Sequence, residues 1–268
     1  MRIREGRHPD ILYIKQTDKI RGIQEAQKAF NNQLEVAVQS EDSEKVKETL
    51  VTIVEETLME PRSGSLEGVS STVNILIDDY SRSTDIIQQL IDMSSADYST
   101  VLHSINVMAL TLVFAFYNNY SKTECKTLGL SALLHDVGKT KIKNEILTAQ
   151  RELTNEEFDE IKNHTKAGYN ILRTCKFEER EVSLCALEHH ETLDGCGYPS
   201  SKRNVSKIAQ IIGLIDCYEA LTNDDRPYRN AMTAFDALNG VIKTNVKDGK
   251  FNKEIYTQFV KSLGTIMG

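Results

Sequence analysis

A histidine and an aspartate stand side by side at the end of an apolar stretch. His135 and Asp136 follow residues 128–134, in which only small residues separate the leucines. Buried without a partner, such a polar pair would be costly. As ligands of a divalent metal ion, imidazole nitrogen and carboxylate oxygen are both well suited. The pair therefore predicts a metal site, provided that the rest of the chain supplies further ligands.

Ligand-type side chains recur at comparable places along the chain. Five of the six histidines lie between positions 103 and 190, and neutral imidazole is the commonest metal ligand. A second apolar stretch ends in the pair His189 and His190, and apolar residues 208–215 lead directly to Asp216. Adjacent helical residues diverge by about 100°, so neighbouring histidines tend to serve two different ions. The expected metal ligands are His103, His135, Asp136, His164, His189, His190 and Asp216.

This set of nitrogen and oxygen ligands is larger than one ion needs. Two ions bridged by Asp136 would use all of it and leave positions for water and substrate. Without cysteine, the set favours iron or manganese over structural zinc. Paired ions about 3.5–4 Å apart suit in-line displacement at phosphorus, because they activate water and offset charge on the phosphoryl oxygens. Lys139, Arg226 and Arg229 flank the ligands in sequence, and we expect them to contact phosphate.

The elements that must position these residues are helices. Apolar residues at three- and four-residue spacing predict four helices in the first 95 residues, over about 19–37, 46–58, 69–80 and 86–91. Residues 40–43 form a break with N-cap chemistry between the first two. No group of residues suited to catalysis lies in this part. We therefore interpret it as a helical module that senses a signal or dimerises.

The histidine-rich part of the chain also reads as helical. His103 sits in an apolar helical run, and a capping box of Thr154 and Glu157 opens one helix that carries His164 on its buried face. The apolar run 208–215 predicts a helix that ends at Asp216. The fold class is therefore all-α.

Composition also limits the binding partners and the cellular location of the protein. The 268 residues carry a net charge of −7, which argues against a nucleic-acid polymer as partner. No apolar stretch approaches the roughly 20 residues of a membrane span, and no signal peptide is recognisable. The five cysteines form no CxxC pair and are odd in number, as in a reducing compartment. We expect a cytoplasmic protein with reduced thiols and no membrane contact.

Taken together, these motifs identify a family. The segments HDVGK at 135–139, HHETLDGCGYP at 189–199, DCYEALT at 216–222 and RPYR at 226–229 resemble the HD-GYP family, a branch of the HD phosphohydrolase superfamily. The resemblance covers about residues 97–265. It implies an HD-type helical bundle over 96–268, preceded by the N-terminal helical module over 1–95.

The resemblance also implies a function. Proteins of this family are bacterial signalling enzymes that hydrolyse cyclic di-GMP to pGpG or on to GMP at a binuclear or trinuclear metal centre, often of iron or manganese. It implies catalytic roles for Asp136 and Lys139, and substrate contacts by Lys139, Tyr198, Arg226 and Arg229. The loop Gly197-Tyr198-Pro199 is linked in the family to diguanylate cyclase (GGDEF) domains, which are therefore expected partners. A homodimer through the N-terminal helices is a further expectation.

Departures from the family pattern qualify this reading. Members with three metals carry a glutamate four residues before the first histidine, where this chain has Ser99, so we predict two ions. The loop between Pro199 and Ile208 is short, and the segment before Arg226 holds an extra residue. Two alternatives stay open: a slow or inactive signalling adaptor that binds cyclic di-GMP or a cyclase, and a phosphohydrolase acting on another nucleotide.

Overall fold

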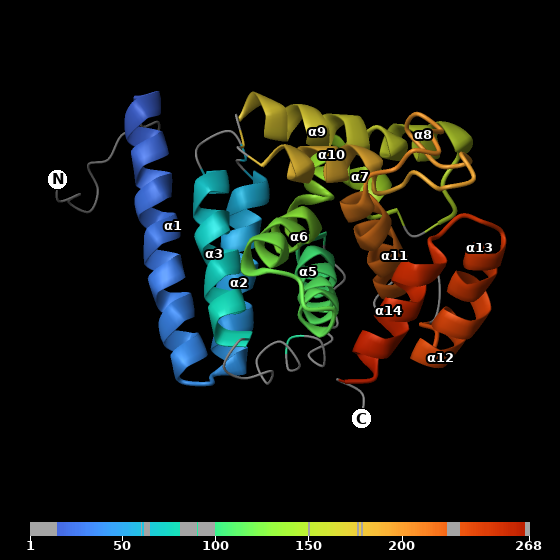
Figure 1. Cartoon of the computed structure of the whole chain (residues 1–268). Coiled ribbons are helices and arrows are strands. Elements are labelled where there is room, and N and C mark those ends of the chain that lie inside the picture. The colour runs from blue at the N-terminus through green and yellow to red at the C-terminus, as the bar shows by residue number, and fades with distance from the viewer. Residues whose placement is uncertain are drawn as a thin grey trace.

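The computed structural model describes most of the chain as helices joined by loops (Figure 1), with no strand in the described part. The described residues are 15–59, 61, 65–80, 90, 100–149, 151–175, 177, 179–223 and 231–265. The expectation of an all-α fold is confirmed. The predicted helix over 86–91 falls almost wholly outside the described residues, as do Ser99, Arg226 and Arg229.

In the described N-terminal part the chain forms three long helices: α1 (Gln16–Gln39), α2 (Ser43–Met59) and α3 (Ser65–Tyr80). The predicted break between the first two is confirmed, because the Asp42 carboxylate accepts the backbone N–H of Lys45 at 3.0 Å. Helix α3 lies against α6 (Lys122–Leu134), where a Cβ on Gly129 would meet Val73 at 2.8 Å. One hydrophobic core runs from Leu34 in α1 to Leu263 near the end of the described chain.

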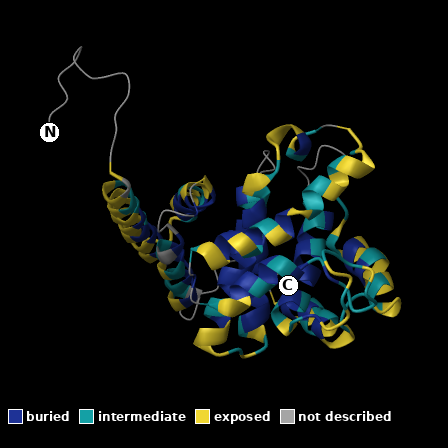
Figure 2. Cartoon of the chain, turned by 90° about the horizontal axis from the view of Figure 1, so that it is seen from above, coloured by how far each residue is buried: buried dark blue, intermediate teal, exposed yellow. Residues whose placement is uncertain are grey.

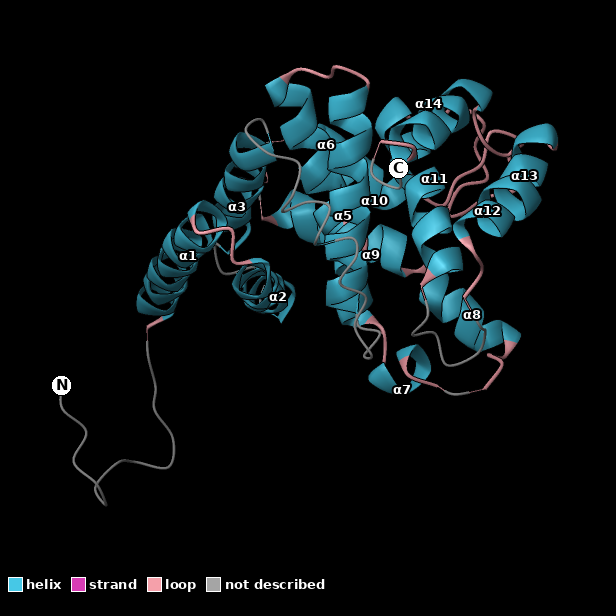
Figure 3. Ribbon diagram, turned by 90° about the horizontal axis from the view of Figure 1, so that it is seen from below, coloured by secondary structure: helices cyan, strands magenta, loops and turns pink. Residues whose placement is uncertain are grey.

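Helix α5 (Thr100–Tyr117) lies at the centre of the molecule beside α6 (Figure 3). Contrary to the expectation that no apolar stretch approaches a membrane span, α5 is by length and composition long and apolar enough to cross a membrane, but 72% of it is buried within the fold. Burial of this kind is what a core helix requires. Figure 2 shows the buried residues in dark blue toward the inside of the helical assembly, with exposed residues in yellow around it. The five cysteines all carry free thiols.

The remaining elements surround this centre. The short 3₁₀ helix η1 (Val137–Lys141) follows α6, and α7 (Asn144–Leu147), α8 (Asn155–Lys162), α9 (His164–Thr174) and α10 (Arg180–Glu188) come next. Helix α11 (Lys207–Thr222) packs on α5 and α10. The chain continues through α12 (Ala234–Asp236), the π-helical turn η2 (Ala237–Ile242), α13 (Lys243–Lys247) and α14 (Lys253–Leu263).

Two sequence-based boundaries are wrong. The capping box of Thr154 and Glu157 is present, but the helix it opens stops at Lys162, and His164 begins a separate helix after Asn163. Asp216 does not end its helix, because α11 continues to Thr222. The polar residues beyond Asp216 are accommodated, since Glu219 is buried among hydrogen-bond donors and Leu221 joins the core.

Candidate metal centre

The His135-Asp136 pair is placed in the interior by helix α6. All seven residues from Leu128 to Leu134, together with Cys125, are buried. His135 caps the C-terminal end of the helix and keeps helical backbone angles. His135 is 1% exposed and Asp136 is 2% exposed. The sequence prediction that this pair is buried is therefore confirmed, and its polar atoms need partners.

Two glycines allow the backbone segments around the pair to approach closely. A Cβ on Gly138 would lie 1.9 Å from the carbonyl oxygen of His164, so η1 touches α9 directly. A Cβ on Gly213 would lie 2.3 Å from the carbonyl oxygen of His189, so α11 touches the end of α10. Only glycine fits at such contacts. They bring His135, Asp136, His164, His189 and Asp216 into one region.

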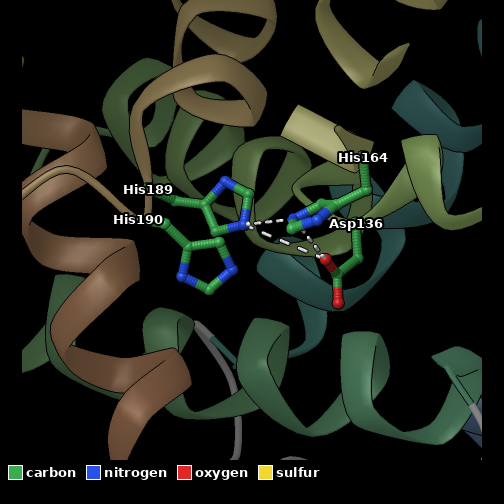
Figure 4. Close-up of side chains that lie close together, drawn as sticks. All are labelled: Asp136, His164, His189 and His190. Carbon is green, nitrogen blue, oxygen red and sulfur yellow. Dashed lines mark hydrogen bonds and ion pairs between the residues drawn. The ribbon is translucent and has the colours of Figure 1, made fainter. Parts of the chain in front are cut away.

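The first group of candidate ligands is Asp136, His164, His189 and His190 (Figure 4), whose ligand atoms all lie within 4.8 Å of one another. Asp136 Oδ1 is 3.3 Å from His164 Nε2 and 3.9 Å from His189 Nε2. The Nε2 atoms of His164 and His189 are 3.3 Å apart. These side chains come from the end of α6, the start of α9 and the end of α10, and they point toward one another.

The second group is His103, His135 and Asp216, whose ligand atoms also lie within 4.8 Å of one another. Asp216 Oδ1 lies 3.0 Å from His103 Nε2 and 4.0 Å from His135 Nε2. Asp136 faces this group with its other oxygen, because Oδ2 is 3.6 Å from His103 Nε2 and 3.3 Å from His135 Nε2. The Asp136 carboxylate thus stands between the two groups, with one oxygen toward each.

Three of the imidazoles are oriented by contacts between their Nδ1 atoms and backbone carbonyl oxygens. The Nδ1 of His135 contacts the carbonyl oxygen of Ala132 at 2.6 Å, and the Nδ1 atoms of His164 and His189 contact those of Ile161 at 2.7 Å and Cys185 at 3.1 Å. A carbonyl oxygen only accepts, so each Nδ1 must carry the hydrogen. The Nε2 lone pairs of these rings are therefore directed into the centre, which is the tautomer that metal binding requires.

The electrostatics of the centre favour cations. Burial works against ionisation of Asp136, yet the charge of Lys139 and the adjacent His135 ring hold the pKa of this carboxyl well below its usual range. Burial, together with the neighbouring imidazoles, lowers the pKa of His189, and burial lowers that of His164. The centre therefore offers anionic carboxylates and neutral imidazoles, which are the protonation states that metal ligands need.

Two polar atoms support a divalent cation as the missing partner. Among the described residues, His135 Nε2 and Asp136 Oδ1 are buried and make no hydrogen bond. Such atoms normally find a partner, and both lie within the groups described above. Nitrogen and oxygen ligands of this composition fit a divalent metal ion, and two ions can be held because Asp136 reaches both groups.

The expected substrate-contacting residues lie beside the centre where they are described. Lys139 Nζ donates to Asp136 Oδ2 at 2.5 Å and keeps 20% of its side chain exposed. The Tyr198 ring stacks on His190, with centroids 4.6 Å apart and planes at 30°. Arg226 and Arg229 lie outside the described residues.

Three buried glutamates that the sequence motifs did not predict as site residues support the centre. Glu219 contacts His103 Nδ1 at 2.5 Å. Glu191 accepts the backbone N–H groups of Ser200 and Lys202, and so fastens the loop that carries Tyr198. Glu188 binds Lys202 in the same loop. One signal was available for Glu219: it follows Asp216 by three residues and so shares its helix face.

An all-helical bundle with a buried histidine and aspartate centre is the architecture of a metal-dependent phosphohydrolase domain, and comparisons with known proteins assign the family. The HD domain family model matches residues 75–255. The chain therefore belongs to the HD domain family. Its resemblance to the HD-GYP branch is confirmed, since curated relatives at 31% identity are named cyclic di-GMP phosphodiesterases.

The relatives are named as phosphodiesterases. The chain is 31% identical over 195 residues to cyclic di-GMP phosphodiesterase PA4108 of Pseudomonas aeruginosa, covering 70% of this chain and 46% of that protein. It is 31% identical over 139 residues to 3'3'-cGAMP-specific phosphodiesterase 1 of Vibrio cholerae, covering 51% and 32%. The chain thus spans less than half the length of these curated relatives.

A solved structure shares the fold. Bd1817, an HDG"Y"P protein from Bdellovibrio bacteriovorus, matches with a TM-score of 0.73 at 16% identity, covering 92% of this chain and 81% of that chain. At this identity the match supports the fold alone. Because it includes almost the whole chain, it extends to the N-terminal helices as well as the histidine-rich part.

Proposed function

We propose that this chain is a metal-dependent phosphodiesterase that hydrolyses cyclic di-GMP to pGpG, with GMP as the product of further hydrolysis. The observation that carries the proposal is the position of Asp136, whose two oxygens face two separate groups of candidate ligands. A shared carboxylate of this kind suits a pair of cations, and paired cations suit phosphodiester cleavage. The names of the relatives supply the substrate class.

The proposed cofactors are two divalent ions, iron or manganese. His164, His189 and His190 with Asp136 would hold one, and His103, His135 and Asp216 with Asp136 the other. Bound there, the ions would activate water and offset the charge that develops on the phosphoryl oxygens.

The protein's own residues would orient the substrate around this centre. The Lys139 ammonium, already directed at the centre by Asp136, is placed to donate to a nonbridging phosphate oxygen. The half-buried Tyr198 ring borders the same space through its stack on His190. Arg226 and Arg229 would grip the two phosphates of the dinucleotide, because guanidinium groups bind phosphate through paired hydrogen bonds.

The test is a substrate screen with a matched metal analysis. Protein purified without oxygen and loaded with Fe(II) or Mn(II) is incubated with cyclic di-GMP, with 3'3'-cGAMP and with a linear dinucleotide, and the products are separated by chromatography. We expect cyclic di-GMP turnover that Asp136→Asn abolishes together with metal binding. A metal-loaded protein that cleaves no cyclic dinucleotide would contradict the proposal.

An adaptor role is the second proposal for the same site. Its support is the short loop after Pro199, which is fastened by Glu191 and is partly exposed around Gly197 and Tyr198. Such a surface suits docking of a diguanylate cyclase (GGDEF) domain, and the N-terminal helices suit homodimerisation. Calorimetry that shows cyclic di-GMP binding without turnover would favour this role over the enzyme.

A further inference from the structure

Glu219 is a buried carboxylate that contacts one candidate ligand, His103, directly. It is 3% exposed and lies on α11, one turn beyond Asp216. Its Oε2 is 2.5 Å from His103 Nδ1. Its Oε1 accepts the side-chain amides of Asn106 at 3.1 Å and Asn223 at 2.8 Å. Both oxygens are therefore satisfied, which is what makes a buried charge tolerable.

His103 is held between two carboxylates from a single turn of α11. Glu219 contacts its Nδ1, and Asp216 Oδ1 lies 3.0 Å from its Nε2. Asn106 follows His103 by three residues on α5 and binds the other oxygen of Glu219. Glu219 therefore fixes the rotation of the imidazole and places the hydrogen on Nδ1, so that the Nε2 lone pair faces Asp216 and Asp136.

This contact distinguishes the two groups of ligands. The Nδ1 atoms of His135, His164 and His189 contact backbone carbonyl oxygens, whereas that of His103 contacts a carboxylate. A full negative charge behind an imidazole makes it a stronger electron donor than a carbonyl dipole does, and such partners change metal affinity by about 10–100-fold. The His103 group alone receives this support among the described contacts.

We propose that Glu219 is a positioning residue that sets the cation affinity of the His103, His135 and Asp216 group separately from that of the group containing His164, His189 and His190. The inference rests on the proposed function only in taking the two groups as cation sites. It makes no use of the phosphodiesterase reaction, so it is tested by binding of the metal alone.

The experiment is a titration of metal-free protein with Mn(II), in which electron paramagnetic resonance measures the free ion. Wild type is compared with Glu219→Gln and Glu219→Ala. The control is Asn31→Ala, which removes another buried side chain with two hydrogen bonds, to Gly68 and Thr72 on α3. Far-UV circular dichroism and thermal melting establish that each variant is folded.

We expect two bound ions in wild type and in the Asn31→Ala control. In Glu219→Ala one site keeps its wild-type affinity and the other weakens by about 10–100-fold. Glu219→Gln falls between, because an amide oxygen still accepts the Nδ1 hydrogen but carries no charge. This graded loss of one site is not what general destabilisation would produce.

Each other result overturns a stated part of the reasoning. Unchanged affinity at both sites in Glu219→Ala, or equal weakening of both, overturns the selective role of Glu219 while leaving the proposed function intact. If Glu219→Ala does not fold, the isosteric Glu219→Gln decides, and wild-type binding at both sites in that variant overturns the inference. A wild-type protein that binds no Mn(II) contradicts the metal centre itself, and both proposals fail with it.

Discussion

Replacing Gly138 by alanine tests whether the close contact between η1 and α9 holds the centre together. The new Cβ would lie 1.9 Å from the carbonyl oxygen of His164 and 2.5 Å from the backbone nitrogen of Gly168. Contacts of a real Cβ are essentially never shorter than 3.0 Å, so the first distance must grow from 1.9 Å by about 1.1 Å. Both close atoms belong to the backbone of α9, so no side-chain rotation relieves the clash, and η1 and α9 must separate.

The expected effects follow from that displacement. Overpacking of an interior typically costs about 1–3 kcal/mol, and a contact with backbone on both sides places Gly138→Ala toward the upper end. His164 moves with its helix, so its Nε2 leaves the position 3.3 Å from Asp136 Oδ1. A misplacement of about 1 Å at a catalytic centre costs roughly 100-fold in rate. We expect weaker metal binding and a comparable loss of turnover.

Chemical denaturation and Mn(II) titration measure these effects, and Gly22 provides the matched control. Gly22 lies on the exposed face of α1, where an added Cβ meets nothing within 4 Å. Gly22→Ala should therefore stabilise the protein by about 0.5–1 kcal/mol and leave metal binding unchanged. If Gly138→Ala unfolds at the wild-type denaturant concentration and binds two ions with wild-type affinity, the account of this contact is refuted.

Three further predictions concern the surroundings of the centre. Lys139→Met should keep both ions and lower kcat, because we expect the Lys139 ammonium to contact the substrate phosphate. Loss of metal in this variant would show that Lys139 serves instead to hold Asp136 in place. Glu191→Ala should raise KM and speed amide hydrogen exchange in the loop carrying Tyr198, since two backbone N–H groups lose their acceptor; unchanged exchange would contradict this role. Burial lowers the pKa of His190 to about 3. The unfolded chain binds a proton at this residue near pH 6.5, whereas the folded chain binds one only near pH 3. The free energy of unfolding of metal-free protein should therefore fall as pH drops below 6.5. The fall should be shallower in His190→Asn, and equal slopes would argue against a neutral imidazole in the folded protein.

Local patterns in the sequence predicted much of the secondary structure. The capping box of Thr154 and Glu157 and the break at Asp42 depend on side chains that bond to nearby backbone, so a few residues suffice to predict them. The division of the next helix at Asn163 and the continuation of α11 past Asp216 were missed. Both depend on which distant groups meet these segments, and Glu219 is tolerated within α11 because donors on another helix and at the helix end satisfy it.

The sequence by itself determined the types of the candidate ligands and their burial. Apolar runs that lead into His135 and Asp136 can only place those side chains in the interior, and nitrogen and oxygen donors without cysteine limit the metals they suit. These conclusions need only residue chemistry and spacing along one segment.

The tertiary structure alone decided how the ligands divide. His103 and Asp216 are more than a hundred residues apart in the chain, yet their side-chain atoms lie 3.0 Å from each other because α11 packs on α5. Which oxygen of Asp136 faces which group, and that Glu219 stands behind His103, follow from the same packing. Contacts between helices depend on the relative positions of whole elements, which no short stretch of sequence specifies.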